Sequence, residues 1–376
     1  PSPTPTPSPT PTPTPTPVPV PTICLDSWLR VTLPSSIVKN TLAFGGDKFL
    51  IASSTETFVS FDGKDWAVYP NVIPGTLGNP VVGPFIDLTY SQGSFYGLMA
   101  DQNASVTVWS TDGNSFGDSS HILWSARNGA GAGAPSKAQY TSICASNARV
   151  MAVANNSNIA IVAFTQDNQT IYSWLKKTLP AVANWTKVIF GQNKFLALAS
   201  FASGAISDEY GDNWRTVVMP SSENWTCAAF GNNLWIAAAY QSNKLALSGD
   251  GVAWAPGALP TTLQTRDLKF INGRFVILAD SGLIYESTDG MNWTQAPLPV
   301  TLSAGSGKAY LAYGNNYVVT TFPDTAEVYR SYCPLALTCG QTYDTLVGLK
   351  PYIVGPPGPV GDTIGATGFF STTSNS

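Results

Sequence analysis

The chain has 376 residues, of which 11% are charged and 44% are apolar, and its net charge is −4. A charged fraction well below the usual ~25% favours a rigid, β-rich extracellular protein over a cytosolic enzyme. Nucleic acid is not an expected partner because no basic run could neutralise phosphates, and no apolar run approaches the ~20 residues of a membrane span. The single histidine excludes a multi-histidine zinc site, and neither a metal nor a cofactor is expected.

Residues 1–22 alternate Pro with Thr, Ser or Val. This composition cannot bury a core and favours an extended polyproline conformation, so it predicts a semi-rigid linker. A stalk with O-linked sugars on the threonines is the alternative. Because the chain begins with Pro1 rather than Met, a preceding segment is expected to have been removed.

A hairpin motif recurs through the following 300 residues. In each copy a Gly/Asn turn joins two apolar runs, as in 190–195 (FGQNKF) and 230–235 (FGNNLW). The seven copies begin at residues 44, 90, 145, 190, 230, 270 and 313. A period near 40 residues is typical of a four-stranded propeller blade.

A second motif, S-x-D-G-x-x-[W/F], runs in step with the first at 60–66, 110–116, 248–254 and 287–293, and 207–214 is a longer fifth copy. In such a turn the aspartate accepts main-chain hydrogen bonds, glycine takes a positive φ and the aromatic side chain fills the space between sheets. The motif is therefore predicted to be a folding device. Its expected structural residues are Asp62, Asp112, Glu209, Asp250 and Asp289, with the aromatic residues Trp66, Trp214, Trp254 and Trp293.

Over about residues 24–333 these motifs resemble the Asp-box (BNR-repeat) β-propellers, a family that includes sialidases, sortilin-type receptor ectodomains and a photosystem assembly factor. Four of the five boxes are one residue shorter than the usual S-x-D-x-G-x-x-W, which implies a tighter turn. The predicted fold is all-β, with a seven-bladed β-propeller at 23–335 between the linker at 1–22 and a tail at 336–376.

The seventh blade lacks a fourth strand at its own end of the chain, and residues 27–34, which match 293–299, are predicted to supply it. In that alignment Cys24 and Cys333 fall on one turn. A Cys24–Cys333 disulfide is therefore predicted, with Cys24–Cys339 and Cys333–Cys339 as alternatives. The other two cysteines are expected to be small buried residues: Cys144 and Cys227.

Long connections at about 67–87 and 117–141 are expected on the rim opposite the boxes, where propellers usually bind ligands. The candidate ligand-binding residues on that rim are Trp124, Arg127, Trp185 and Trp225. Their aromatic rings are candidate platforms for sugar rings. The alternative is that these tryptophans cover the junctions between blades.

The tail contains three Gly-X-Y triplets at 355–363. This run resembles the short collagen-like segments of phage tail fibres and bacterial surface proteins, which implies a possible homotrimeric contact. A plain flexible tail is the alternative, because three triplets are too few for a stable collagen helix alone.

The resemblance to sialidases implies an arginine triad, a Tyr–Glu pair and an acid/base Asp, but none of the seven arginines lies in the Arg-Ile-Pro context of that family. The sequence therefore predicts no enzymatic activity. It predicts an extracellular or virion-surface recognition protein, part of a larger fibre-like assembly, that binds a surface glycan, a protein receptor or neighbouring subunits through its rim loops. A secreted glycan-active hydrolase is the alternative, and a purely architectural subunit is a third possibility.

Overall fold

The computed structural model describes residues 25, 27–35, 41–72, 84–100, 106–111, 122–123, 125–126, 138–164, 174–296, 309–322 and 326–331. Within these ranges the only helix is the 3₁₀ turn η1 (Asp280–Gly282), and no helix is long and apolar enough to cross a membrane. The linker at 1–22, the tail at 336–376 and the predicted disulfide of Cys24 and Cys333 lie outside the described residues.

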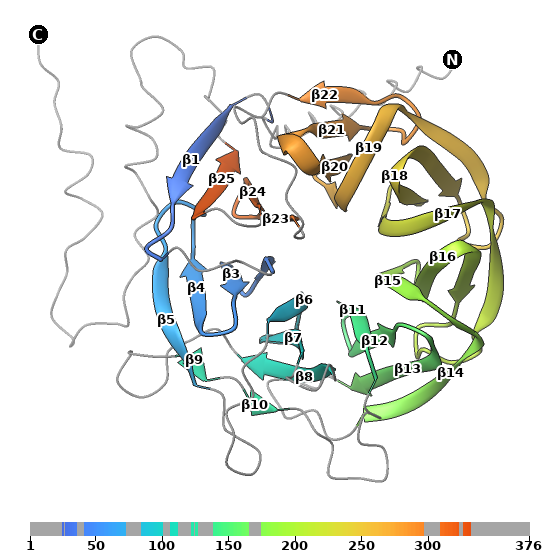
Figure 1. The fold of residues 1–376 in the computed structure, drawn as a ribbon, viewed down its shortest axis with the longest axis horizontal. Coiled ribbons are helices and arrows are strands. Elements are labelled where there is room, and N and C mark those ends of the chain that lie inside the picture. Colours follow the sequence, from blue (N-terminus) through green and yellow to red (C-terminus); the bar gives the residue numbers. More distant parts are fainter. Residues whose placement is uncertain are drawn as a thin grey trace, which may run out of the picture. The chain divides into compact units, whose positions relative to one another are not determined.

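The strands form sheets that follow one another around a central axis (Figure 1). The first sheet in chain order contains β2 (Ala43–Gly45), β3 (Lys48–Ala52), β4 (Glu56–Ser60), β5 (Ala67–Val72) and β9 (Ile122–Leu123). The second contains β6 (Phe85–Ser91), β7 (Ser94–Ala100), β8 (Val106–Thr111) and β10 (Ser125–Ala126). The third contains β11 (Tyr140–Ala145), β12 (Arg149–Ala154), β13 (Ser157–Phe164) and β14 (Trp174–Ala183).

An eight-stranded sheet follows, made of β15 (Trp185–Gly191), β16 (Lys194–Ile206), β17 (Arg215–Gly231), β18 (Leu234–Ser248), β19 (Ala255–Ile271), β20 (Arg274–Ala279), β21 (Ile284–Ser287) and β22 (Thr294–Ala296). Its long strands serve two successive units. In β17, residues 215–218 pair with β16, whereas residues 225–231 pair with β18. The outer strand of one unit thus continues into the innermost strand of the next within a single element, with a shift of register between the two paired stretches.

The connection predicted at 117–141 is partly strand. Its two short strands pair with different sheets: β10 pairs antiparallel with β8, while β9 pairs in parallel with β5. The segment therefore ties the first two sheets together at their outer edges.

The last sheet joins the two ends of the propeller. It contains β1 (Trp28–Thr32), β25 (Glu327–Ser331), β24 (Tyr317–Thr321) and β23 (Tyr310–Gly314). In β1, Trp28 pairs with Ser331 and Arg30 pairs with Tyr329. This antiparallel pairing confirms the predicted closure by the N-terminal strand, which leaves β25 with a neighbour on both sides.

The recurring Phe-Gly hairpin packs each sheet onto its neighbour. Phe230 and Trp235 of one hairpin have ring centroids 4.7 Å apart. In the next unit of the eight-stranded sheet the Phe270 ring lies over Gly231, so that a Cβ atom on Gly231 would lie 2.0 Å from the ring. The same contact recurs between Gly191 and Phe230. The glycine of the motif is therefore required by the close approach of the next aromatic side chain.

The hydrophobic core lies between neighbouring sheets and forms several clusters. In one cluster Phe49 and Phe58 of the first sheet pack with Val319 and Val328 of the closing sheet, and all four side chains are fully buried. Burying each large apolar side chain contributes roughly 1.5–3 kcal/mol. Closure of the ring therefore buries apolar side chains as well as pairing strands.

The aspartate boxes have the predicted turn geometry. Asp289 Oδ1 accepts hydrogen bonds from the N–H groups of Met291 and Asn292, each at 2.8 Å, and Trp293 Nε1 donates to Gly290 O at 3.0 Å. The main-chain N–H and side-chain amide of Asn292, with the N–H of Met291, hold the pKa of Asp289 well below its usual range. The turns with Asp62 and Trp66 and with Asp250 and Trp254 repeat this pattern.

In the longer box the assignment of Glu209 is wrong. Asp208 accepts from the N–H groups of Tyr210, at 2.9 Å, and Asp212, at 2.8 Å. The extra residue moves the turn acceptor to the position directly after Ser207. The Trp214 indole N–H, unlike those of the regular boxes, has no hydrogen-bond partner in the described part of the chain. Asp112 lies outside the described residues.

Candidate functional site

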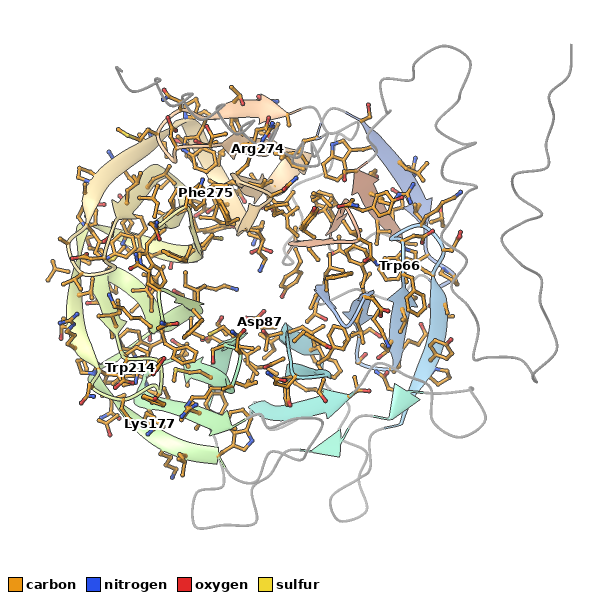
Figure 2. The ribbon with its side chains drawn as sticks, turned by 180° about the vertical axis from the view of Figure 1, so that it is seen from behind. Trp66, Asp87, Lys177, Trp214, Arg274 and Phe275 are labelled. Atoms are coloured by element: carbon orange, nitrogen blue, oxygen red, sulfur yellow. The ribbon has the colours of Figure 1, made fainter. Side chains whose placement is uncertain are left out.

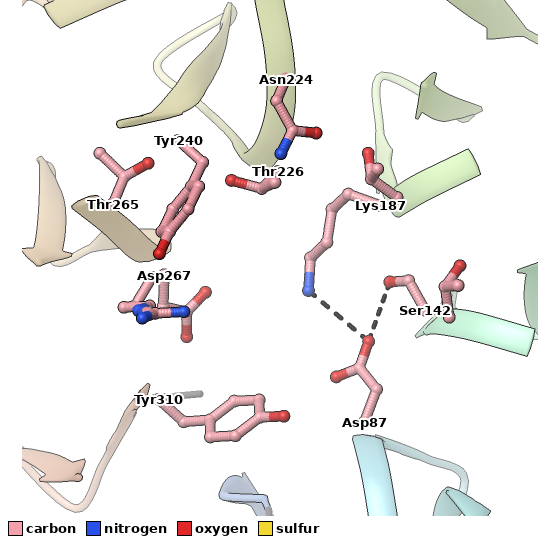
Figure 3. A pocket seen from close by; sticks show the side chains of 12 residues that line it. Asp87, Ser142, Lys187, Asn224, Thr226, Tyr240, Thr265, Asp267 and Tyr310 are labelled. Atoms are coloured by element: carbon pink, nitrogen blue, oxygen red, sulfur yellow. Dashed lines mark hydrogen bonds and ion pairs between the residues drawn. The ribbon is translucent and has the colours of Figure 1, made fainter. Parts of the chain in front are cut away.

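A pocket of about 370 Å³ lies where the innermost strands surround the axis (Figure 3). We call it the axial pocket. It is lined by Asp87, Thr141, Ser142, Thr186, Lys187, Asn224, Thr226, Tyr240, Thr265, Arg266, Asp267 and Tyr310. Figure 2 shows Asp87 at the inner edge of its sheet, whereas Trp66 lies within the body of the propeller.

One position of the repeat supplies the centre of the axial pocket. Asp87, Lys187 and Asp267 each precede the hairpin aromatic residue of their own unit by three residues. These side chains come from β6, β15 and β19. Equivalent positions of a repeat occupy equivalent places around the axis, so residues far apart in the sequence meet here.

A β-bulge before this position allows neighbouring residues of one strand to face the pocket together. The pairing register shifts between Trp185 and Lys187 and between Thr265 and Asp267, and β6, β11 and β17 have the same shift. Successive residues of a regular strand point to opposite faces, whereas a bulge re-aims one of them. Both members of the pairs Thr186–Lys187 and Arg266–Asp267 consequently line the axial pocket.

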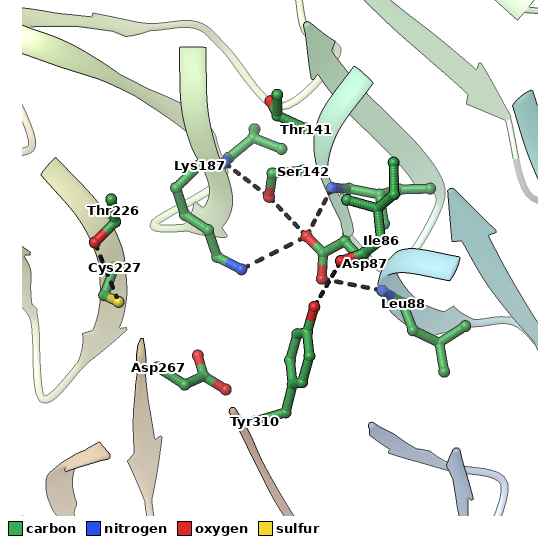
Figure 4. Close-up of polar contacts among 12 residues, drawn as sticks. Ile86, Asp87, Leu88, Thr141, Ser142, Lys187, Thr226, Cys227, Asp267 and Tyr310 are labelled. Atoms are coloured by element: carbon green, nitrogen blue, oxygen red, sulfur yellow. Dashed lines mark hydrogen bonds and ion pairs between the residues drawn. The ribbon is translucent and has the colours of Figure 1, made fainter. Parts of the chain in front are cut away.

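The Asp87 carboxylate is fixed by the neighbouring unit (Figure 4). Its Oδ2 accepts hydrogen bonds from Ser142 Oγ at 2.8 Å and from the N–H of Ile143 at 3.1 Å. Its Oδ1 accepts from the N–H of Leu88 at 3.0 Å. The side chain therefore links two sheets and has little freedom to reorient.

Asp267 is held in the same way. Its Oδ1 accepts from the N–H of Leu268 and its Oδ2 from the N–H of Leu311 on the closing sheet, both at 2.9 Å. The Nζ of Lys269 lies 3.6 Å from Oδ1. Both carboxylates of the axial pocket are thus positioned acceptors, with side chains only 8% and 5% exposed.

Lys187 extends between these carboxylates. Its Nζ lies 3.6 Å from Asp87 Oδ2, and the side chain is 16% exposed. Burial lowers the pKa of Lys187, but the charges of Asp87 and Asp267 outweigh burial and raise it above its usual value. The ammonium group therefore stays charged, and no described residue lies close enough to form a hydrogen bond with it.

Two tyrosines form a wall of the pocket. The Arg266 guanidinium lies 4.9 Å from the Tyr240 ring centroid and makes two hydrogen bonds with the buried Asp280 carboxylate, at 2.5 and 2.6 Å. Tyr310 donates its hydroxyl hydrogen to Ile86 O at 2.6 Å, and burial raises its pKa well above the usual value. Both rings are therefore held in fixed orientations.

The pocket opens on the rim opposite the aspartate boxes. Tyr240 lies in the middle of β18, where its pairing changes from β17 to β19, whereas Gly249 lies in the box that follows the end of β18. Gln192, in the hairpin after the innermost strand β15, donates from Nε2 to Gly249 O at 3.0 Å, which places that hairpin on the box rim. The start of the innermost strands, where the pocket lies, is at the other rim.

The predicted aromatic platforms are not part of this surface. The Trp185 and Trp225 side chains are 2% and 0% exposed and pack in the hydrophobic core between units. The prediction that they contact a ligand is therefore wrong, and the alternative, that they cover the junctions between units, agrees with their burial. Each indole N–H donates to a main-chain carbonyl, Ser157 O and Ser221 O respectively. Trp124 and Arg127 lie outside the described residues.

The polar side chains of the axial pocket were missed because they lie in separate repeats and form no sequence motif. The sequence did contain one signal for this pocket. When the seven repeats are aligned on their hairpin aromatic residue, Asp87, Lys187 and Asp267 fall at the same repeat position. In the described part of the chain no group of three His, Cys, Asp or Glu side chains is placed to hold a metal ion.

No protein-family model matches the sequence, and the search of curated proteins found no match. Solved structures do match. Virginiamycin B lyase from Staphylococcus aureus aligns with a TM-score of 0.62 and 12% identity over 82% of this chain and 99% of that one. YCF48 bound to D1 peptide aligns with a TM-score of 0.59 and 14% identity over 84% of this chain and 99% of that one. YCF48 from Cyanidioschyzon merolae aligns with a TM-score of 0.57 and 13% identity over 81% of this chain and 98% of that one. At these identities the likeness shows the fold, a β-propeller.

The comparison corrects the prediction that the chain is not an enzyme. That prediction relied on the missing sialidase residues, yet the similar structures include a lyase, which is an enzyme. The absence of the sialidase residues therefore does not exclude enzymatic activity in a chain with this fold. The fold alone does not transfer that activity to this chain.

Proposed function

We propose that the protein is a recognition module that binds a partner at the axial pocket, as part of an extracellular or virion-surface assembly. The observation that carries this proposal is the Lys187 ammonium, which is buried between two fixed carboxylates and retains hydrogen-bond donors for a ligand. Preorganised polar groups in a concave site are typical of ligand recognition.

We infer that the propeller has seven four-stranded units and that the eight-stranded sheet forms three of them. The reason is that the repeat position occupied by Asp87, Lys187 and Asp267 occurs once in each unit. The turns with Asp62, Asp250 and Asp289 share one geometry, which supports membership of the Asp-box propellers.

The proposed partners are a surface glycan, a protein receptor or a neighbouring subunit. A structure similar to this chain is described as bound to a peptide, which supports protein partners for propellers of this shape. The low charge, the Pro/Thr-rich residues 1–22 and the Gly-X-Y triplets at 355–363 support display on a fibre-like assembly, with a homotrimeric contact through the tail.

Binding of the full chain to a glycan array and to candidate receptor proteins tests the proposal, with Asn224→Trp as the variant. Asn224 is exposed at the pocket, so a tryptophan there should obstruct the entrance without entering the core. Met291→Trp adds the same ring at a residue 73% exposed on the opposite rim. Binding lost only in Asn224→Trp supports the proposal, whereas binding unchanged in that variant contradicts it.

Catalysis needs its own measurement. Two carboxylates beside a pocket are also the groups that a glycosidase uses, so a glycan-active hydrolase is the second candidate. Incubating each bound glycan with the protein and analysing for cleaved sugar decides between the two. Cleavage that is abolished by both Asp87→Asn and Asp267→Asn would favour the hydrolase.

A further inference from the structure

We infer that the axial pocket takes a neutral, polyhydroxylated group, in the simplest case one uncharged sugar residue at the end of a glycan. This inference rests on the proposed function and names the ligand class of the same site. It follows from the hydrogen-bonding groups that remain free, from the balance of charges and from the aromatic wall.

Most hydroxyl groups around the pocket already donate to the protein. Thr141 donates to Trp185 O at 2.6 Å, Thr265 donates to Ala239 O at 2.8 Å, and Ser142 donates to Asp87. Tyr310 donates to Ile86 O. Because each hydroxyl has one hydrogen, these groups offer a ligand acceptor positions only.

The donors left for a ligand are few and close to strong acceptors. Lys187 has three N–H groups and forms no hydrogen bond with a described residue. The side-chain amide nitrogen of Asn224 forms no hydrogen bond with a described residue either, because the Asn224 atom that accepts from Ser200 Oγ is Oδ1. The carboxylates of Asp87 and Asp267 lie on either side of Lys187 (Figure 3). Each oxygen of Asp267 accepts one main-chain hydrogen bond and has capacity for another. One ligand hydroxyl can accept a hydrogen bond from Lys187 and donate one to a carboxylate at the same time. Adjacent hydroxyl groups on a ligand therefore fit a site in which a donor lies between acceptors.

The charges at the pocket balance one another. Two carboxylates face Lys187, and Lys269 lies beside Asp267, so two negative charges meet two positive ones. Arg266 is neutralised by Asp280. A ligand carboxylate that reached Lys187 would lie next to Asp87, and a ligand ammonium would meet Lys187 itself. A neutral ligand avoids both repulsions.

The shape of the site agrees with this chemistry. A volume of about 370 Å³ lies at the small end of the range for small-molecule pockets, roughly 300–1,000 Å³. The Tyr240 and Tyr310 rings border it and offer apolar surface to the C–H face of a sugar ring. None of the described residues that line the pocket has an aliphatic side chain, so an apolar ligand would leave the polar groups without partners.

The test is a glycan array followed by calorimetric titration with the strongest neutral glycan. Methyl β-glucoside, glucosamine and N-acetylneuraminic acid serve as competitors that differ in charge. We expect glycans with neutral ends to bind and the neutral competitor to displace them better than either charged sugar. Preference for the amine or the acid would overturn the inference, and this comparison needs only the unmodified protein.

Lys187→Met removes the free donors but keeps the length of the side chain, and we expect it to weaken binding about tenfold or more. Lys194→Met is the control: it removes a lysine whose Nζ donates to Asp250 O at 3.1 Å on the rim of the aspartate boxes, away from the pocket. Its affinity should stay within about twofold of the wild type. Equal affinities for wild type and a folded Lys187→Met variant would contradict the inference.

The outcomes separate the inference from the proposed function. If no glycan binds but a protein partner does, and Asn224→Trp abolishes that binding, the sugar assignment is wrong and the recognition site stands. If neither glycans nor candidate receptors bind the wild-type protein, both fail.

Discussion

Gly231→Ala tests the packing between successive units of the eight-stranded sheet. The added methyl group would lie 2.0 to 2.3 Å from three carbon atoms of the Phe270 ring, well inside van der Waals contact. Phe270 belongs to the next hairpin and packs on Phe275 with a centroid distance of 4.9 Å, so it cannot move freely. Overpacking of this kind costs roughly 1–3 kcal/mol, and we expect about 2 kcal/mol.

Gly249→Ala is the control in the same unit. Gly249 is exposed, and a Cβ atom there would meet nothing within 4 Å, so we expect a change within about 0.5 kcal/mol. Urea unfolding followed by tryptophan fluorescence, with thermal unfolding as a second measurement, gives the comparison. A loss of 2 kcal/mol corresponds to a fall in Tm of roughly 4 °C for a domain of this size.

A double variant tests whether the Phe270 ring causes the destabilisation. In a Phe270→Leu background the aromatic ring that the new methyl group would meet is gone, so Gly231→Ala should cost less than about 1 kcal/mol there. Equal stability of the Gly231→Ala and Gly249→Ala proteins would refute the contact. If Gly231→Ala costs as much in the Phe270→Leu background as in the wild type, the destabilisation has another origin.

Three further predictions concern the boxes, the thiols and the closing strand. The folded-state pKa of Asp289 is lowered, so the contribution of Asp289 to stability is complete above about pH 5 and is lost as the pH falls. Between about pH 5 and pH 3 the Asp289→Asn variant should therefore lose less free energy of unfolding, measured by urea titration, than the wild type. Equal losses in the two proteins would contradict this prediction. Cys227 is 1% exposed and burial raises the pKa of its thiol to about 11, so it should not react with iodoacetamide at pH 8 unless the protein unfolds. Cys144 is half-buried and is the thiol to compare it with; modification of Cys227 in the native state would be contrary evidence. Deletion of residues 1–33 removes β1 and should lower Tm strongly, whereas deletion of 1–22 should not; similar Tm values for the two truncated proteins would argue against ring closure through β1.

The repeated elements were predictable from the sequence because each depends on local chemistry. The Phe-Gly hairpin is visible at 230–235, since the turn residues and the aromatic residue are neighbours in the chain. The closing strand was predictable because Trp28 has a counterpart in Trp293. In the longer box, however, one inserted residue was enough to misplace the turn acceptor, which is Asp208 rather than Glu209.

The axial pocket was not predictable in the same way. Its central groups, Asp87, Lys187 and Asp267, meet only when three units are arranged around the axis, and the bulges that bring Thr186 and Arg266 to the same surface depend on strand pairing. The tryptophans were misassigned because their burial is not visible in the sequence. A tryptophan at the start of an innermost strand, such as Trp225, is as suitable for a junction between sheets as for a sugar platform, and only packing distinguishes the two.

The most direct test of the axial pocket as the recognition site is a crystal structure of the protein soaked with the strongest glycan from the array. We predict ligand density between the Lys187 ammonium and the carboxylates of Asp87 and Asp267, with a sugar hydroxyl within about 3.2 Å of the lysine nitrogen. Density on the rim of the aspartate boxes, with the axial pocket holding only solvent, would contradict it.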